Sequence, residues 1–164
     1  MKREGVNRWL ADYIEAWKSY DPDRIGALFS DDAEYRYYPG EEPLRGREAI
    51  VASWLADRDP EGTYDADYRV VAVDGEVAVA TGSSTYLTEP GGPIDRVYDN
   101  CFVMRFGDDG RCREYTEYYQ ARDPEQLVLQ LRFVYDLTDH EIAERVGIPQ
   151  AEVSRILEAA RLRE

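Results

Sequence analysis

The sequence between residues 64 and 120 is strongly patterned for β-structure, and this pattern stops at Pro124. Within it, Asp74-Gly75 is a dipeptide typical of a two-residue hairpin turn, and Gly-Asp-Asp-Gly at 107–110 marks a second hairpin. A loop rich in glycine and proline separates the two hairpins. The sequence therefore predicts four long antiparallel strands, and the chain beyond Pro124 must fold in another way.

Helices and one shorter strand are predicted before the hairpins. Apolar residues recur at helical spacing from Leu10 to Trp17, which gives this segment one apolar face. A second helix should begin after Asp21, an N-cap residue that is followed by proline. A strand and a short helix over 46–57 come next. This order predicts the α+β class, with an antiparallel sheet and helices on one face.

The last segment of the chain has a pattern typical of three short helices. Thr138 and Glu141 stand three residues apart, which is the spacing of a capping box that starts a helix. Gly147 follows that helix and can adopt the left-handed conformation needed between two helices. We therefore predict two domains, residues 1–122 and residues 123–164.

The composition excludes several classes of protein. A formal net charge of -14 at pH 7 repels nucleic acid and anionic lipid at long range. No apolar run approaches the roughly 20 residues of a membrane span, and the start of the chain lacks the features of a signal peptide. Cys101 and Cys112 do not have metal-binding spacing. We therefore expect a cytoplasmic protein with no metal, no cofactor and no contact with a membrane.

Three segments carry a family resemblance: AWKSYDPDRIGALFSDDAEY at 16–35, PLRGREAI at 43–50 and FGDDGRCREYTEYYQ at 106–120. In this order, residues 7–120 resemble the nuclear transport factor two-like superfamily, in particular its SnoaL-like branch. The resemblance implies a cystatin-like fold, in which a conical, bent antiparallel sheet wraps around the N-terminal helices and leaves an open pocket. It also implies a homodimer, because many members pair through the outer face of the sheet.

A carboxylate and an amide are predicted to share this pocket. If the second hairpin places Phe106 opposite Arg111, then Asn100 lies opposite Glu117 on the inward face. Burial raises the pKa of a carboxylate toward neutrality, as a general acid or base requires. Glu117 is therefore the candidate catalytic residue, with Asn100 and Tyr13 as polarising groups. Two alternatives stay open, in which Glu117 is a satisfied buried polar residue or faces outward at a dimer contact.

The rest of the pocket wall is expected to be aromatic and apolar, because side chains alternate between the two faces of a strand. Such a wall suits a small apolar or aromatic ligand. The candidate ligand-binding residues are Trp17, Tyr35, Tyr37, Trp54, Tyr98, Phe102, Met104, Tyr115 and Tyr119. The inward face of residues 76–88 stays unassigned.

Three activities known in the superfamily do not fit the residues. The ketosteroid isomerase pattern keeps Tyr13, but Tyr37 and Phe102 stand where that family has its catalytic and its protonated aspartate. The single histidine, His140, lies outside the predicted pocket domain, which excludes histidine-based dehydration. An epoxide-hydrolase set of two aspartates and an arginine cannot be assembled in the pocket, because Asp99 is predicted to face outward.

The segment LTDHEIAERVGIPQAEVSRIL at 137–157 resembles the helix-turn-helix units of bacterial regulators and of the last domain of sigma factors. This resemblance implies DNA binding through the last helix. The candidate DNA-binding residues are Gln150, Ser154, Arg155 and Arg161. Residues 125–164 contain eight acidic residues and five arginines, a net charge of -3, so binding would be weak and sensitive to salt. The alternative is a helical fold used for packing or for contact with a partner.

Three functions therefore remain open. In the first, the chain is a ligand-responsive DNA-binding regulator, whose pocket senses a small molecule. In the second, it is an enzyme of the isomerase, cyclase or hydrolase type that uses Glu117 on a small apolar substrate. In the third, it is a non-catalytic interaction protein.

Overall fold

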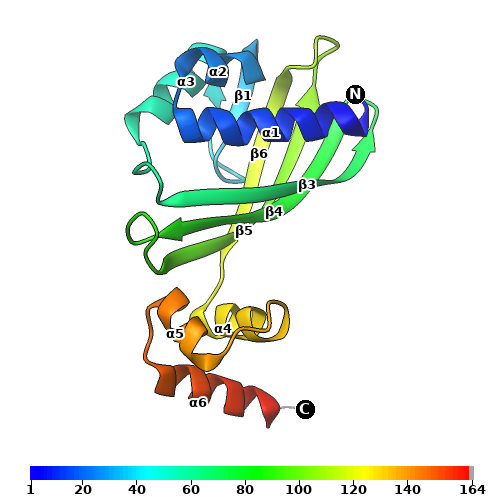
Figure 1. The fold of residues 1–164 in the computed structure, drawn as a ribbon. Helices are drawn as coiled ribbons and strands as arrows, with labels where there is room; N and C mark the ends of the chain where they lie inside the picture. Colours follow the sequence, from blue (N-terminus) through cyan, green and yellow to red (C-terminus); the bar gives the residue numbers. More distant parts are fainter. Residues whose placement is uncertain (163–164) are drawn as a thin grey trace.

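A computed structural model describes residues 1–162 of the chain and has the predicted α+β architecture (Figure 1). The first part, here called the sheet unit, consists of α1 (Arg3–Ser19), α2 (Pro22–Leu28), β1 (Phe29–Arg36), β2 (Leu44–Arg45), α3 (Arg47–Ala56), β3 (Tyr64–Asp74), β4 (Val77–Leu87), β5 (Ile94–Phe106) and β6 (Cys112–Ala121). The second part, here called the tail, consists of α4 (Pro124–Phe133), α5 (Asp139–Val146) and α6 (Gln150–Arg161). The predicted tail boundary reached residue 164, and positions 163–164 lie outside the described residues.

The six strands form one curved sheet with the order β2-β1-β6-β5-β4-β3. Helix α1 lies across one face of this sheet, and α2 and α3 lie beside its β1 end (Figure 1). Neighbouring strands are antiparallel, as predicted, except that β1 runs parallel to β6. No local pattern predicts this pair, because the two strands are far apart in the chain and no local turn joins them.

The two hairpin turns differ slightly from their predicted positions. Asp74 pairs with Val77, so the first turn lies one residue later than predicted. In the second hairpin, Phe106 pairs with Cys112, and a bulge in the next step brings Arg105 opposite Glu114. In this second hairpin, the later pairing of Phe106 and the bulge together shift the remaining pairs by two residues. A shift of two leaves each side chain on its predicted face, whereas a shift of one would have inverted the faces.

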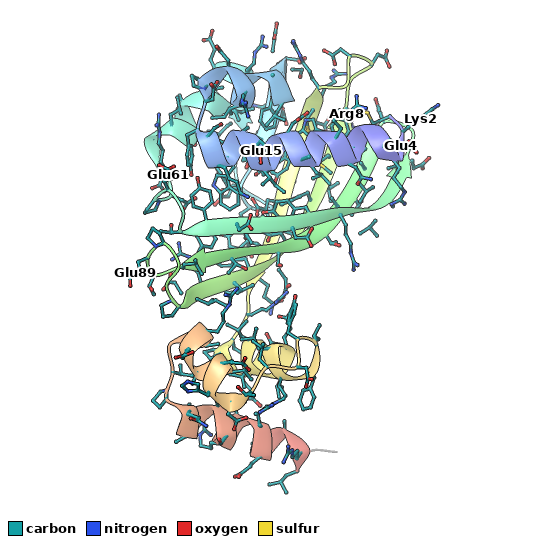
Figure 2. The ribbon with its side chains drawn as sticks, in the orientation of Figure 1. Lys2, Glu4, Arg8, Glu15, Glu61 and Glu89 are labelled. Carbon is teal, nitrogen blue, oxygen red and sulfur yellow. The ribbon has the colours of Figure 1, made fainter. Side chains whose placement is uncertain are left out.

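The core of the sheet unit lies between α1 and the concave face of the sheet. Val6, Leu10 and Ala16 of α1 are almost fully buried there, and the Trp9 indole N–H donates to the Leu28 carbonyl at 2.9 Å. The opposite face of α1 is charged, and its side chains point to solvent (Figure 2). Burial of this apolar stripe, rather than helix propensity, therefore fixes α1 against the sheet.

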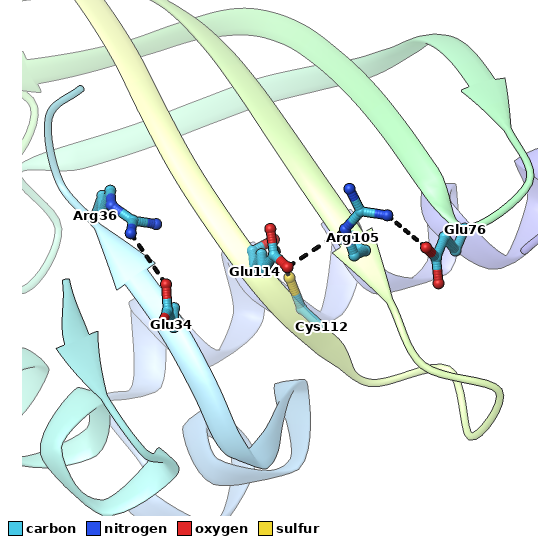
Figure 3. A network of polar contacts seen from close by, with 6 residues as sticks. All are labelled: Glu34, Arg36, Glu76, Arg105, Cys112 and Glu114. Atoms are coloured by element: carbon cyan, nitrogen blue, oxygen red, sulfur yellow. Dashed lines mark hydrogen bonds and ion pairs between the residues drawn. The ribbon is translucent and has the colours of Figure 1, made fainter. Parts of the chain in front are cut away.

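The convex face of the sheet carries ion pairs both within one strand and between neighbouring strands (Figure 3). Arg105 on β5 pairs with Glu76 and, at 3.4 Å, with Glu114 on β6. Arg36 and Glu34 on β1 pair at 3.0 Å. Because these groups are partly exposed to water, each pair contributes little stability, typically less than about 1 kcal/mol.

The tail forms the predicted helix-turn-helix arrangement. Thr138 and Glu141 make the predicted capping box: the Thr138 hydroxyl accepts from the Glu141 N–H, and the Glu141 carboxylate accepts from the Thr138 N–H. Gly147 ends α5 with a φ of 72°, a conformation that costs a residue with a Cβ more than it costs glycine. Ile142 and Val153 are fully buried and hold α5 against α6.

The tail also packs against β5 of the sheet unit. Its apolar cluster includes Ile94 and Val97 from β5, together with residues of all three tail helices. Arg122, which directly follows β6, donates to the Asp99 carboxylate on β5 and to the side-chain oxygen of Gln130 on α4. The strand that carries the candidate residue Asn100 is therefore also part of the tail's core.

No helix within residues 1–162 combines the length and the apolar character that crossing a membrane requires.

Candidate functional site

A cavity of about 370 Å³ lies between α1, the end of α3 and the concave face of the sheet. Its base is formed by buried side chains such as Tyr13 and Tyr35, and its mouth by the more exposed Asp57 and Arg96. The residues that line it are Tyr13, Trp17, Tyr20, Tyr35, Tyr37, Trp54, Asp57, Asp59, Tyr68, Ser84, Tyr86, Arg96, Tyr98, Asn100, Glu117 and Tyr119.

Glu117 on β6 points into this cavity and contacts Asn100 on β5. The Asn100 side-chain N–H donates to Glu117 Oε1 at 2.7 Å. The predicted pairing was wrong, because Glu117 lies opposite Phe102 and Asn100 lies opposite Tyr119. The bulge near the hairpin turn causes this difference. Glu117 and Asn100 are diagonal neighbours on one face, and their long side chains still meet.

The Glu117 carboxylate is poised to exchange a proton near neutral pH. Burial in the cavity raises its pKa from 4.5 to about 7, and the hydrogen bond from Asn100 only partly opposes this rise. Both protonation states are therefore populated under physiological conditions. A group with this pKa can serve as a general acid or a general base.

Three tyrosines form a hydrogen-bonded cluster at the base of the cavity. The Tyr115 hydroxyl donates to the Tyr13 hydroxyl at 3.3 Å, and the hydroxyls of Tyr13 and Tyr35 are also 3.3 Å apart. Burial is the main cause that raises the pKa of all three phenols, and the nearby Glu117 carboxylate raises it further. They remain neutral hydrogen-bond donors at physiological pH.

Ser84 on β4 fixes the orientation of the Asn100 amide. The Ser84 hydroxyl donates to Asn100 Oδ1 at 3.1 Å, so the amide nitrogen faces Glu117. Both Ser84 and Asn100 are almost fully buried, and the hydrogen bond between them gives each buried polar group a partner. Ser84 is thus a positioning residue for the Glu117 carboxylate.

The mouth of the cavity carries Asp59, which is held by two aromatic side chains. Its carboxylate accepts hydrogen bonds from the Trp17 indole N–H at 3.0 Å and from the Tyr20 hydroxyl at 3.1 Å. Tyr20 ends α1 with a φ of 47°, a left-handed conformation that is uncommon for residues other than glycine. Backbone strain of this kind is often found at functional sites.

The four candidate DNA-binding residues lie on or at the start of α6. Gln150 and Arg161 are exposed. Ser154 donates to Asp139 Oδ2 at 2.7 Å and so holds α6 against α5. Arg155 Nε donates to Glu152 at 2.9 Å, and a second nitrogen of the same guanidinium pairs with the other carboxylate oxygen.

The family model of the SnoaL-like domain matches residues 10–115. The chain belongs to the SnoaL-like domain family. Residues 123–163, which include the tail, match the family model of sigma-70, region 4. A comparison with curated protein sequences gives no match.

Solved structures share the fold of the SnoaL-like domain. An NTF-2 like protein of unknown function from Burkholderia xenovorans aligns with a TM-score of 0.56 at 18% identity, over 73% of this chain and 86% of its own. An LEH-like epoxide hydrolase from M. tuberculosis aligns with a TM-score of 0.53 at 18% identity, over 72% of this chain and 84% of its own. At this level of identity the likeness concerns the fold alone.

Within the SnoaL-like domain, the predicted pocket residues fall into two groups. Trp17, Tyr35, Tyr37, Trp54, Tyr98 and Tyr119 line the cavity, as do Glu117, Tyr13 and Asn100. Phe102, Met104 and Tyr115 are at most 1% exposed and pack in the core beneath the cavity wall. Their face was predicted correctly, but α1 covers that part of the face, so no cavity forms there.

Several lining residues of the SnoaL-like domain were missed from the sequence. Ser84 and Tyr86 lie on the strand whose inward face stayed unassigned, and Arg96 lies beside Tyr86 in the strand pairing. Asp57 and Asp59 follow α3 in a loop, where no periodicity indicates direction. Among residues 1–162 no group of three histidine, cysteine, aspartate or glutamate side chains is arranged to hold a metal ion.

Proposed function

We propose that this chain is a DNA-binding regulator whose SnoaL-like domain binds a small molecule and thereby alters DNA binding by the tail. The main support for this proposal is that β5 contributes residues both to the cavity and to the apolar cluster of the tail. Tyr98 and Asn100 on one face of β5 line the cavity, while Val97 on the other face packs in the apolar cluster of the tail. A ligand that moves β5 would therefore move part of the tail's core.

Arg122 supports this coupling with a second path. It joins Asp99 on β5, the residue next to Asn100, to Gln130 on α4. Side-chain hydrogen bonds have strict geometric requirements, so a small rotation of β5 would favour one position of α4 over another. Coupling of this kind amounts to a change in binding free energy of typically about 1–3 kcal/mol.

The DNA-binding part of the proposal is supported by the match of residues 123–163 to sigma-70, region 4, and by the helix-turn-helix geometry. The electrostatics oppose tight binding. Arg155 is neutralised by Glu152, and the chain as a whole carries a charge of -14. We therefore expect weak association that weakens further as salt is added.

Substitution of Glu152 tests the DNA-binding proposal. Glu152→Gln removes a charge and releases Arg155, so affinity for a fluorescent DNA duplex of mixed sequence should rise by ~3–10-fold at about 50 mM salt. Arg155→Ala in the same background should cancel this gain. Fluorescence anisotropy across a salt series measures both effects.

Glu89→Gln is the matched control, because it removes the same charge from a loop of the sheet unit (Figure 2). It should change DNA affinity much less than Glu152→Gln does. The proposal fails if neither the wild type nor Glu152→Gln changes the anisotropy at low salt.

A second function, acid–base catalysis, is favoured by one observation. Glu117 combines a pKa of about 7 with a place in the cavity wall beside the Asn100 amide. The cavity also offers neutral phenols, such as that of Tyr13, that can donate to a substrate oxygen. Isomerisation, cyclisation and hydrolysis all use such a combination.

Turnover of a panel of small aromatic esters and ketones tests this second function. If Glu117 acts as a general base, Glu117→Gln should lower the rate by ~100-fold or more. The wild-type rate should rise with pH through an inflection near 7, because the base must be ionised. Glu114→Gln, on the exposed face of the same strand, should leave the rate unchanged. Equal rates for the wild type and Glu117→Gln would exclude the acid–base role.

A further inference from the structure

We propose that the cavity recognises an organic cation, such as an amine or quaternary ammonium group on a hydrocarbon body. The inference rests on the proposed ligand-binding function and names the class of ligand. It is based on three carboxylates, Asp57, Asp59 and Glu117, that line one aromatic cavity. Aromatic rings and carboxylates together provide the surroundings in which proteins bind such cations.

The planes of the aromatic rings near the mouth of the cavity are steeply inclined to one another. Trp17 and Tyr86 have centroids 5.9 Å apart at 61°, Tyr86 and Tyr98 are 5.9 Å apart at 85°, and Tyr98 and Tyr119 are 5.3 Å apart at 79°. Edge-to-face contacts turn successive ring faces in different directions. A group of rings arranged in this way can surround a rounded ammonium group from several sides.

Two cations of the chain already lie over aromatic faces at this end of the molecule. The Arg96 guanidinium lies 4.5 Å from the centroid of the Tyr86 ring, and that of Arg58 lies 5.6 Å from the centroid of Tyr20. Arg96 also pairs with Asp95 at 2.7 Å, so much of its charge is offset outside the cavity. These contacts show that rings at this end of the molecule hold positive charge over their faces, although the Arg96 guanidinium itself occupies one face of Tyr86.

Two of the three carboxylates of the cavity accept hydrogen bonds from neutral donors. Asp59 accepts from Trp17 and Tyr20, and Glu117 accepts from Asn100. Among residues 1–162, none of the ion pairs involves Asp57, Asp59 or Glu117. Burial is the main cause that raises the pKa of Tyr86; the charges of Asp59 and Glu117 raise it further, and the charge of Arg96 opposes them.

Three probes of nearly equal shape test the inference on the full chain: choline, the neutral 3,3-dimethylbutan-1-ol and the anionic 3,3-dimethylbutanoate. Titration at pH 8, followed by tryptophan fluorescence and calorimetry, should show choline binding at least ~10-fold more tightly than the alcohol. The carboxylate should bind most weakly. The inference is overturned if choline does not bind, or if the alcohol or the carboxylate binds as tightly as choline.

Variants locate the site. Asp59→Asn and Glu117→Gln should each weaken choline binding by ~5–10-fold and leave alcohol binding unchanged. Glu61→Gln, outside the cavity lining, is the matched control and should have little effect on either probe. Loss of both probes in a variant that unfolds at the wild-type temperature would contradict a charge-specific role.

The pH dependence gives an independent readout. Choline affinity should fall between pH 8 and pH 6 in the wild type, because Glu117 becomes protonated, and should fall less in Glu117→Gln. The phenols around Glu117 have raised pKa values and stay neutral over this range. The single histidine lies in the tail, outside the cavity.

Failure of this inference can be told apart from failure of the proposed function. DNA affinity is measured with and without saturating choline. If choline binds but leaves DNA affinity unchanged, the cation inference stands and the proposed coupling fails. If choline does not bind while the chain still binds DNA, the ligand class is wrong and DNA binding stands.

Discussion

Replacing Glu117 by glutamine should stabilise the folded protein by about 3 kcal/mol at pH 8. In the folded state the pKa of Glu117 is about 7, whereas its ordinary value is 4.5. Between these values the folded chain holds a proton that the unfolded chain has released, so a rise in pH favours unfolding. Glutamine does not ionise and can still accept the hydrogen bond from Asn100. The variant therefore avoids the cost of a buried charge.

The sign of this effect makes the measurement specific. Urea unfolding at several pH values should give nearly equal stabilities for the wild type and Glu117→Gln near pH 4. The difference should grow in favour of the variant up to pH 7 and stay constant above it. Glu114→Gln provides a control on the same strand, because its exposed side chain should change stability by less than about 0.5 kcal/mol. A difference that does not vary with pH would show that Glu117 is not buried in a charged form.

Replacing Ile142 by alanine should destabilise the chain by ~2–5 kcal/mol. Ile142 is 0% exposed and lies in the apolar cluster of the tail, so its removal leaves a cavity that the helices cannot fill completely. Because Ile94 and Val97 of β5 belong to the same cluster, the loss of packing should also destabilise the sheet unit. We therefore expect one cooperative transition at a lower denaturant concentration.

The distribution of tryptophan allows this cooperativity to be measured. All three tryptophans lie in the sheet unit, whereas circular dichroism also reports the helices of the tail. In Ile142→Ala the two signals should shift together. Val134→Ala is the control, since that side chain is 69% exposed and its loss should have little effect. A shift confined to circular dichroism would mean that the tail unfolds independently.

The sequence predicted the class of fold because local rules decide it. Period-two patterning, the N-cap at Asp21, the capping box at Thr138 and the glycine at 147 each depend on neighbouring residues only. The face of each hairpin residue was also predictable, because alternation survives a register shift of two. Glu117 was therefore assigned to the inward face, although its predicted partner was wrong.

Features that depend on distant contacts could not be predicted in this way. The bulge near Arg105 depends on how β5 and β6 twist together, and the parallel pairing of β1 with β6 depends on the closure of the whole sheet. Asp59 lies in a loop whose direction is set by Trp17 and Tyr20. The packing of Val97 against the tail likewise has no local signal, because an isolated valine on an outer strand face is common.

The apolar contact between β5 and the tail also determines where this chain can be truncated and to which other domains its tail can be fused. A fragment ending at residue 122 would leave Ile94 and Val97 facing water without their covering helices. Such a fragment should self-associate during purification, unlike a SnoaL-like domain whose surface is polar at these positions. Conversely, grafting this tail onto another SnoaL-like domain should succeed only where the recipient strand offers two apolar side chains at the matching positions.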